Sequence, residues 1–378
     1  MDSVERLLRD LVAIDSVNPT LVPGAAGEAA VARRIVQELE AIGLTVEVQE
    51  VAPGRPNVVG TLAGRAPGRS LMLCGHIDTV GVAGMATPFE PVVRDGRMYG
   101  RGSQDMKSGV AAMIDAVRVV AEGGGLDAGR VVVACVVDEE HSSIGADALV
   151  TRWRADAGIV TEPTDLDVAV CHKGFAWSEV VTTGRAAHGS RPADGIDAIV
   201  HMGRVLAALG DLDRQLQAGA RHARLGAASL HASTISGGRE LSSYPDRCVL
   251  QVERRTIPGE PETVLGAEIA AILARLAAAD PAFTATTTSL FTRPPYEIEA
   301  SHALPALLGA AARAAGCRAS TIGMSFWTDA AVLAGAGIPS VLFGPTGGGL
   351  HSVEEWVDLT SVRQCRDALA ATVRAWCR

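Results

Sequence analysis

Apolar runs that end near acidic or histidine residues recur along this chain. The segment "LMLCGHIDTV", residues 71–80, begins with four apolar residues and carries His76 and Asp78 just beyond them. A short continuous apolar run is typical of a strand buried on both faces, as in a parallel sheet. Because side chains alternate along a strand, His76 and Asp78 are expected to point to the same side. The pattern therefore predicts two titratable groups side by side at the end of a buried strand.

Helix and strand patterns alternate over residues 1–172, which is the signature of an α/β domain. The expected helices cover about 3–15, 25–43 and 108–124, and the expected strands lie within 45–51, 57–64, 71–76, 130–140 and 157–163. Gly43 follows the second helix and is expected to be its C-cap.

The pattern changes after Lys173 and returns to the first style near residue 291. The intervening part reads strand, helix, strand, strand, helix, strand, at 174–184, 194–210, 229–238, 247–257, 261–279 and 283–290. That order predicts a compact α+β module with an antiparallel, ferredoxin-like sheet. A helix at 303–315, a strand at 340–345 and a helix at 360–376 then complete the chain. We therefore predict one α/β domain, residues 1–172 and 291–378, with a second domain, 173–290, inserted into it.

Composition narrows the classes of partner and compartment. The chain has 378 residues, which favours two domains over one. Its formal net charge of -9 argues against nucleic acid or an anionic membrane as the main partner. The amino terminus lacks the features of a signal peptide, and no apolar stretch approaches the ~20 residues that span a bilayer. Seven scattered cysteines without a C-x-x-C pair predict buried thiols in a reducing cytoplasm.

Candidate ligands follow several of the predicted strands. Asp105 lies in the glycine-broken loop "YGRGSQDMKSG", Glu139 and Glu140 end one strand, Glu162 ends another, and His351 follows "FGPTGGGL". Sites in open α/β sheets form beyond the carboxyl ends of the strands, so these residues are expected to converge with His76. Asp105 has the alternative role of capping the helix that follows it.

Histidine and carboxylate ligands without a thiolate suit Zn²⁺, or Co²⁺ or Mn²⁺ in its place. The set offers more ligands than one tetrahedral ion with an open position needs, and it predicts a pair of ions bridged by one carboxylate and a water. Such a site also needs a carboxylate that binds no metal and moves the proton of the water. Adjacent Glu139 and Glu140 are suited to divide these roles. A nucleotide site is disfavoured because Asp105 occupies the third glycine position of "GRGSQD", and no G-x-S-x-G elbow indicates a serine hydrolase.

The chain resembles the metallopeptidase and amidohydrolase family that includes acetylornithine deacetylase, succinyl-diaminopimelate desuccinylase, aminoacylase and glutamate carboxypeptidase. The resemblance extends over nearly the whole length through "SVNP", "GHIDTV", "GRGSQDMKSG", "DEEHSSIGA", "TEPT", "AAHGSRP", "ERRTIPGE" and "FGPTGGGLHSVEEWV". It implies a zinc-peptidase-like catalytic domain, 1–172 and 291–378, and an inserted lid that also forms a homodimer, 173–290.

The resemblance also implies a role for each matching residue. His76 and Glu162 would hold one ion and Glu140 and His351 the other, with Asp105 bridging them. Glu139 would be the general base and then acid, and Asp78 would orient the imidazole of His76. In the lid, His188 would contact the substrate carbonyl oxygen and Arg255 the substrate carboxylate, with Arg254 on the opposite face. Ser242 stands where the family usually has asparagine in this stretch, a departure that marks a different substrate pocket.

These implications define the expected activity. We expect hydrolysis of the amide bond of an N-acyl amino acid by metal-activated hydroxide, with two zinc ions, or cobalt in their place, as cofactors. A carboxypeptidase or dipeptidase acting on short peptides is the alternative enzyme, and a metal-containing binding protein without catalysis is the alternative from another class. The sequence leaves the acyl group, the native metal and the subunit on which His188 acts open.

Overall fold

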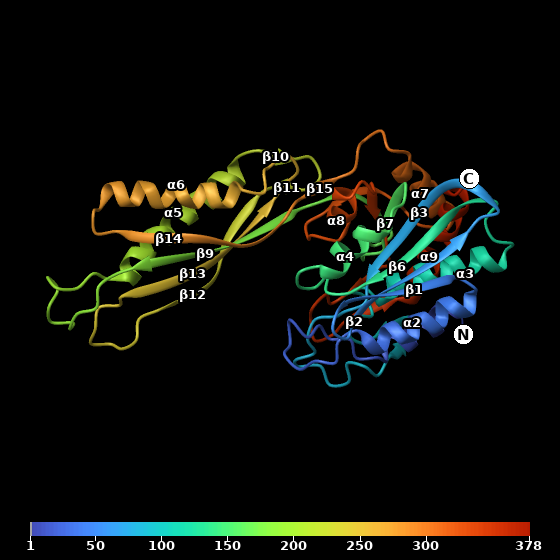
Figure 1. The fold of residues 1–378 in the computed structure, drawn as a ribbon, viewed down its shortest axis with the longest axis horizontal. Helices are drawn as coiled ribbons and strands as arrows, with labels where there is room; N and C mark the ends of the chain where they lie inside the picture. Colours follow the sequence, from blue (N-terminus) through green and yellow to red (C-terminus); the bar gives the residue numbers. More distant parts are fainter. Residues whose placement is uncertain (1) are drawn as a thin grey trace. The chain divides into compact units, whose positions relative to one another are not determined.

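The structure, a computed structural model, describes residues 2–378 and divides the chain into two compact units. The first unit runs to Val170 and resumes over Ile298–Gly323 and Thr328–Arg378, and the second comprises Cys171–Glu297 and Met324–Trp327. The expected division points were residues 172/173 and 290/291. Each unit has its own sheet and its own helices (Figure 1).

A mixed sheet forms the centre of the first unit. Its strands lie in the order β1-β2-β6-β3-β7-β17-β8, where β3 pairs in parallel with β6 and β7, and β17 pairs in parallel with β7. The bounds are β1 (Thr45–Ala52), β2 (Arg55–Ala63), β3 (Ala66–His76), β6 (Ala128–Val136), β7 (Ala157–Val160), β17 (Ser340–Leu342) and β8 (Val168–His172). Short strand β16 (Thr321–Met324) also pairs with β8, and β15 (Tyr296–Glu297), which belongs to the second unit, pairs with Cys171 and His172 at the end of β8. Residues 71–76 of β3 are fully buried, as the apolar run predicts.

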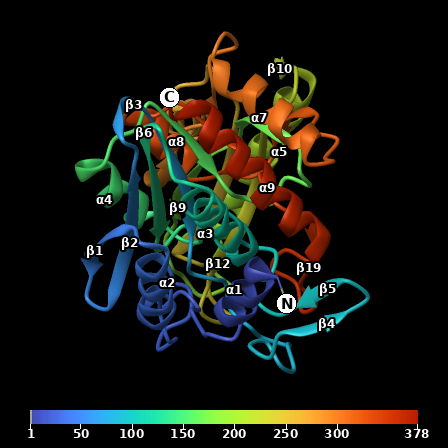
Figure 2. The ribbon, with the colours of Figure 1, turned by 90° about the vertical axis from the view of Figure 1, so that its right-hand side faces the viewer.

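Helices cover both faces of this sheet (Figure 2). One face carries α1 (Ser3–Val12), α2 (Ala29–Ile42), α3 (Lys107–Glu122), α7 (Ala303–Ala314) and α9 (Leu359–Trp376), and the other carries α4 (Ile144–Arg152) and α8 (Ala330–Gly335). Gly43 ends α2 with a left-handed φ of 89°, which confirms the predicted C-cap. The predicted α/β class is confirmed. The short helices α4 and α8 were not predicted, because neither is long enough to show a clear period.

A second, smaller sheet in this unit was also missed. It has the order β18-β19-β5-β4, with bounds β18 (Gly347–Gly348), β19 (Trp356–Asp358), β5 (Arg97–Tyr99) and β4 (Val92–Arg94). Strands of two or three residues carry no readable alternation. This sheet matters because it joins the loop before α3 to the loop that holds His351.

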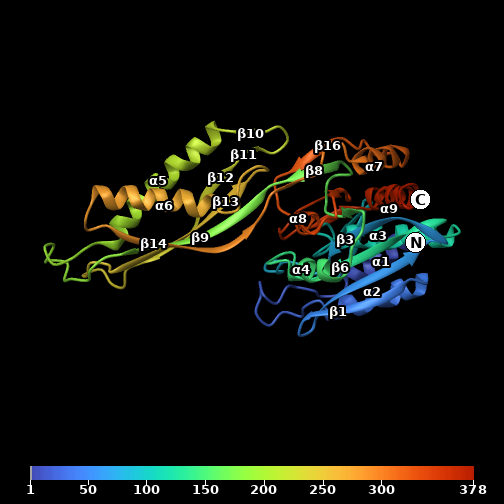
Figure 3. The ribbon, with the colours of Figure 1, turned by 45° about the horizontal axis from the view of Figure 1, so that its top comes forward.

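The second unit is an antiparallel sheet with two helices on one face (Figures 1 and 3). Its elements follow the predicted order: β9 (Gly174–Thr183), α5 (Ala198–Ala218), β12 (Ser229–Gly237), β13 (Arg247–Thr256), α6 (Val264–Ala279) and β14 (Thr284–Arg293), with a ribbon of β10 (Arg221–His222) and β11 (Gly226–Ala227). The strand order is β12-β13-β9-β14, and apolar side chains of α5 and α6 pack on the sheet to form its core. The first helix starts later than expected because the Asp197 side chain caps it by accepting from the Val200 N–H group.

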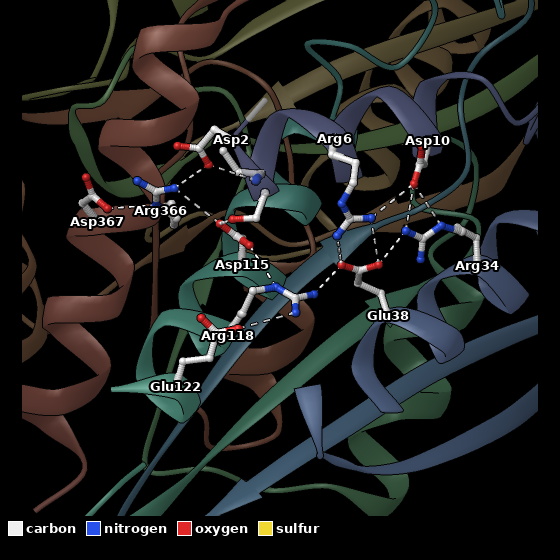
Figure 4. Close-up of polar contacts among 12 residues, drawn as sticks. Asp2, Arg6, Asp10, Arg34, Glu38, Asp115, Arg118, Glu122, Arg366 and Asp367 are labelled. Atoms are coloured by element: carbon white, nitrogen blue, oxygen red, sulfur yellow. Dashed lines mark hydrogen bonds and ion pairs between the residues drawn. The ribbon is translucent and has the colours of Figure 1, made fainter. Parts of the chain in front are cut away.

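Charged groups join four helices of the first unit (Figure 4). Glu38 on α2 is 5% exposed and accepts hydrogen bonds from Arg6 on α1, Arg34 on α2 and Arg118 on α3. On the far side of the network Arg366 of α9 contacts Asp2 and Asp115. Three cations around Glu38 compensate its charge, so this carboxylate can be buried without being left unpaired.

All seven cysteines are buried free thiols, as predicted. Over residues 2–378, no helix combines the length and the apolar character needed to cross a bilayer.

Candidate active site

Three parallel strands bring their terminal residues to one edge of the sheet. His76 is the last residue of β3, and the register aligns His76 with Val136 of β6 and Cys74 with Val160 of β7. Glu162 therefore lies level with His76, and Glu139 follows β6 at the same edge. The expected convergence of these residues is present.

The loop before α3 is held by a buried carboxylate that sequence reasoning missed. Glu355 is 1% exposed and accepts hydrogen bonds from the backbone N–H groups of Gln104 and Asp105 at 2.8 and 3.0 Å. Arg101 donates to the same carboxylate at 2.7 Å. The only sequence signal was the place of Glu355 in "HSVEEWV". The alternative that Asp105 caps α3 is wrong, because Met106 occupies the N-cap position and no side chain caps it.

The two oxygens of Asp105 face two different histidines. Its Oδ1 lies 3.1 Å from Nε2 of His76, and its Oδ2 lies 3.3 Å from Nε2 of His351. Each histidine also faces a second carboxylate: Oε1 of Glu162 lies 3.7 Å from Nε2 of His76, and Oε2 of Glu140 lies 3.1 Å from Nε2 of His351. The result is two nitrogen–oxygen groups that share one carboxylate.

Hydrogen bonding leaves the His76 ring ready to bind a cation. Its Nδ1 lies 3.1 Å from the carbonyl oxygen of Asp78, which can only accept, so Nδ1 carries a proton. The Asp78 carboxylate is farther, with Oδ1 3.6 Å from Nδ1. In the neutral ring Nε2 therefore carries the lone pair. This atom faces the carboxylates of Asp105 and Glu162, so a cation between them would be bound by all three groups. Around a tetrahedral ion with bonds of about 2.0–2.1 Å, ligand atoms lie about 3.4 Å apart, and the observed separations fit this value.

Electrostatics at the site also favour positive charge between these atoms. Burial opposes the imidazolium form of His76, but the Asp105 and Asp78 carboxylates outweigh it and raise the pKa of His76 well above its ordinary value. The carboxylates of Asp105 and Glu140 raise the pKa of His351 to about 10. Burial, together with neighbouring carboxylates, raises the pKa of Glu162 well above its usual range. Bound cations would remove this repulsion.

Glu139 lies beside His76 and Glu162, and one ligand atom of each lies within 4.8 Å of the others. Burial and the carboxylates of Glu162 and Asp329 raise the pKa of Glu139 well above its ordinary value. The backbone N–H groups of Glu139 and Glu140 donate to the Asp78 carboxylate at 3.2 and 3.3 Å. Asp78 therefore anchors the turn that carries both glutamates, besides lying next to His76. Asp329, which sequence reasoning missed, is one further buried carboxylate near this group.

Two of the predicted substrate-contact residues lie together in the second unit. The backbone N–H of Gly189 donates to the Ser242 carbonyl at 2.7 Å, and His188 pairs with Ser243 in an isolated bridge. The imidazole of His188 is exposed, and its Nδ1 accepts from the backbone N–H of Ser190 at 3.2 Å. A backbone N–H can only donate, so the neutral ring carries its proton on Nε2.

Arg255 lies elsewhere on the same sheet. Its guanidinium pairs with Glu253, and its Cζ lies 5.5 Å from the centroid of the Phe175 ring. Arg254 points to the other face, where it is 1% exposed and pairs with Glu260 and Glu268, as predicted. Because Arg255 pairs with Phe175 near the start of β9 while His188 follows the end of β9, the two lie at opposite ends of the sheet.

A third group of possible ligands, Cys171, His222 and Glu297, lies in the second unit. Hydrogen bonds to His222 and a protonated Cys171 thiol account for this group without a bound ion. Backbone N–H groups of Arg224 and Leu225 donate to Nδ1 of His222, so Nε2 carries the proton and donates to Glu297 at 3.2 Å. Burial raises the pKa of the Cys171 thiol to about 11. We assign this group a structural role.

Comparison with known proteins places the chain in a family. Residues 72–375 match the profile of Peptidase family M20/M25/M40. The chain is 30% identical to acetylornithine deacetylase of Myxococcus xanthus, over 90% of each chain. It is 28% identical to N-formyl-4-amino-5-aminomethyl-2-methylpyrimidine deformylase of Bacillus subtilis, over 95% of this chain and 92% of that protein.

Solved structures share the fold. The crystal structure of a tripeptidase from Staphylococcus aureus has a TM-score of 0.82 at 22% identity, over 99% of this chain and 97% of that one. An M20 family metallo-carboxypeptidase from Sulfolobus solfataricus has a TM-score of 0.80 at 15% identity, over 100% and 99%. These matches confirm the family resemblance and the prediction of an enzyme that hydrolyses C–N bonds. The chain belongs to Peptidase family M20/M25/M40.

Proposed function

We propose that this chain is a metal-dependent amidohydrolase that removes the acyl group from an N-acyl amino acid. The observation that carries the proposal is the placement of Asp105, whose two oxygens face His76 and His351 at 3.1 and 3.3 Å. His76 and Glu162 would hold one divalent ion, Glu140 and His351 would hold the other, and Asp105 would bridge them. Two ions bound there supply Lewis acidity and lower the pKa of a water. The ligand set favours zinc, with cobalt as a substitute.

Glu139 is the proposed general base. It lies next to the ligands without being needed as one, and burial together with the neighbouring carboxylates raises the pKa of Glu139, which makes it a stronger base than an exposed carboxylate. It would accept a proton from the attacking water and deliver it to the leaving amine nitrogen. Asp78 would fix Glu139 through the hydrogen bond from the Glu139 backbone N–H at 3.2 Å.

Residues of the second unit are proposed to contact the substrate. The Nε2–H group of His188 is exposed and is free of the bond that Ser190 makes to Nδ1, so it is suited to donate to the carbonyl oxygen as negative charge develops. Arg255 is suited to bind the substrate carboxylate, since a guanidinium recognises a carboxylate with two parallel bonds. Ser242 lies beside His188 and is proposed to line the same pocket.

We also propose a homodimer formed through the second unit. A strand rise of about 3.3 Å per residue places the two ends of β9, from Phe175 to Thr183, about 26 Å apart. One small substrate cannot span from Arg255 to His188 over that distance, so one of the two would act on the site of a partner subunit, and we propose His188 for this role. The edge strand β12 and the adjoining start of α5 expose Ile235, Ile199 and Val200, which a second copy could cover.

The names of the relatives favour acyl removal over peptide cleavage. Two relatives match at least nine-tenths of this chain: the Myxococcus xanthus protein is a deacetylase and the Bacillus subtilis protein is a deformylase. The structural neighbours include peptidases, so a carboxypeptidase or dipeptidase activity on short peptides is the second candidate. A binding protein without catalysis is the third, and it would not need the placement of Glu139. Seven buried thiols favour the cytoplasm as the compartment.

Amine release from a panel of substrates tests the proposal. The panel holds N-acetyl, N-formyl and N-succinyl amino acids and dipeptides, each assayed with metal-loaded and with chelated protein. We expect release from one N-acyl class, loss on chelation and recovery with zinc or cobalt. Release from dipeptides alone would support the peptidase, and no release from protein that holds two ions would support the binding role.

A further inference from the structure

We propose that Asn18 is a positioning residue for the Glu139–Glu140 turn, and that Asp138 and Arg55 hold Asn18 in place. The proposal rests on the proposed function, because it concerns how the chain presents its base and one of its ligands. The segment that carries Asn18 belongs to the "SVNP" motif, whose role the function described above leaves open. The side-chain hydrogen bonds of Asn18 go to Asp78, Asp138 and Thr20, and none of these is a proposed metal ligand.

Asn18 bridges two buried carboxylates. Its Nδ2 donates to Oδ2 of Asp78 at 2.8 Å and to Oδ1 of Asp138 at 3.0 Å. Its Oδ1 accepts from the backbone N–H of Thr20 at 2.9 Å, which fixes the amide with its nitrogen toward the carboxylates. Asn18, Asp78 and Asp138 are each no more than 1% exposed. If a substitution removes the amide but fills its volume, no water can take its place as a hydrogen-bond donor.

Asp78 links this bridge to the reacting groups. Its Oδ2, which Asn18 holds, also accepts from the backbone N–H of Glu140 at 3.3 Å, and its Oδ1 accepts from that of Glu139 at 3.2 Å. Both backbone bonds are longer than the bond from Asn18, which is the shortest hydrogen bond to the Asp78 carboxylate. Without it, Asp78 would be free to turn and the Glu139–Glu140 turn would lose its anchor.

Asp138 and Arg55 complete the bridge on the side away from the metals. Arg55 contacts Oδ1 of Asp138 with Nη1 at 2.8 Å and is itself held by two bonds from Nε to Glu28 at 3.2 and 3.0 Å. Asp138 adopts a positive φ of 68° immediately before Glu139, a conformation that costs energy for a residue other than glycine. The cation and the amide on its side chain hold the residue in this conformation. Asn18, Asp138, Arg55 and Glu28 are all buried, and the Arg55 cation lies between the carboxylates of Asp138 and Glu28.

The first test measures metal affinity and does not depend on turnover. Asn18→Leu keeps the approximate shape and removes the donor. Loss of an outer contact of this kind typically costs 10–100-fold in metal affinity, and we expect a loss of about that size for at least one of the two ions, measured with Zn²⁺ and Co²⁺ by chelator competition. Asn18→Ala, which leaves room for a water, should cost less. If the leucine variant does not fold, the alanine variant answers the question.

A matched control separates positioning from general stability. Arg34→Met breaks the Glu38 network on the same unit, remote in its contacts from Asp78. We expect it to lower the melting temperature of the metal-free protein and to leave both dissociation constants unchanged. Equal loss of affinity in the Arg34 and Asn18 variants would overturn the proposal.

The link to Arg55 is tested by a double-mutant cycle. Arg55→Met should weaken metal binding less than Asn18→Leu, and the loss in the double variant should be smaller than the sum of the two single losses, because Arg55 and Asn18 both act on the Asp138 carboxylate. Additive losses would overturn the proposed link. Wild-type affinity for two ions in the Asn18→Leu variant would overturn the role of Asn18 while leaving the proposed function intact. A wild-type protein that binds no ions would overturn the proposed function itself.

Discussion

His188 and Arg255 lie at opposite ends of one antiparallel sheet in the second unit. Arg255 pairs with Phe175 near the start of β9, and the ladder continues past the end of β9 to the bridge between His188 and Ser243. If both residues contact substrate, they contact different substrate molecules. On the proposed assignment, each active site would receive its histidine from another subunit.

Mixing two inactive variants tests this arrangement. His188→Ala and Glu139→Gln are each expected to be inactive, but a mixed dimer has one site with both an intact Glu139 and a His188 from the partner. After random reassociation of equal amounts, half of the dimers are mixed, and we predict recovery of about a quarter of wild-type activity. No recovery, in a sample shown by mass spectrometry to contain mixed dimers, would mean that His188 serves its own subunit.

The two adjacent glutamates are expected to respond differently to the same substitution. Glu139→Gln should lower kcat by ~10²–10⁴ and leave two ions bound, because Glu139 moves a proton and holds no metal. Glu140→Gln should instead weaken metal binding, because its Oε2 faces His351 at 3.1 Å. Metal content by inductively coupled plasma mass spectrometry, measured beside kcat, separates the two. Loss of metal in the Glu139 variant with unchanged activity per ion would show that the roles are assigned wrongly.

The metal-free protein is expected to lose stability as the pH rises. The carboxylates of Asp105 and Glu140 raise the pKa of His351 to about 10, above its value near 6.5 in the unfolded chain. The folded state therefore binds more protons than the unfolded state between these values, so this contribution is complete below pH 6.5 and is lost by about pH 10.

Melting temperatures of the metal-free protein between pH 6 and 9 check this expectation. His351→Gln should flatten the decline, since it removes the group whose charge is favoured. Zinc should flatten it as well, because the bound cation takes over the same positive charge. A variant whose pH profile matches that of the wild type would show that His351 does not interact with these carboxylates in solution.

A substitution of Glu38 tests how much the charged network outside the site contributes to the free energy of unfolding. Glu38→Gln keeps the shape of the side chain but leaves three arginines around a neutral group, and we expect a loss of about 2–3 kcal/mol in the free energy of unfolding. Glu40→Gln, on the exposed side of the same helix, should change it by less than about 0.5 kcal/mol. Urea unfolding of both variants gives the comparison. Similar stabilities would mean that the network contributes nothing.

The positions of the candidate ligands at strand ends explain why the sequence predicted that they would lie close together. His76, Glu139 and Glu162 each follow an apolar run, and parallel strands place such residues at one edge. The same logic does not reach residues whose role depends on tertiary contacts. Glu355 holds the Asp105 loop across about 250 positions of sequence, and no local pattern distinguishes it from the exposed Glu354 beside it.

Asn18 and Glu38 were missed for the same physical reason. Asn18 meets Asp138 from a loop 120 positions away, and Glu38 meets Arg118 from another helix 80 positions away. Spacing along a helix or strand predicts neighbours on the same element, but these pairs form only when separate elements pack. Short strands such as β18 and β19 were not predicted, because two or three residues show no alternation of apolar and polar side chains.

Asp105 is proposed to join two metal sites through its two carboxylate oxygens. Electron paramagnetic resonance of the protein loaded with Mn²⁺, combined with a count of bound ions, tests it most directly. We predict two ions per chain with an exchange-coupled spectrum, and loss of the coupling in Asp105→Ala. Two ions without coupling in the wild-type protein, or a single ion per chain at saturation, would show that Asp105 does not bridge two ions.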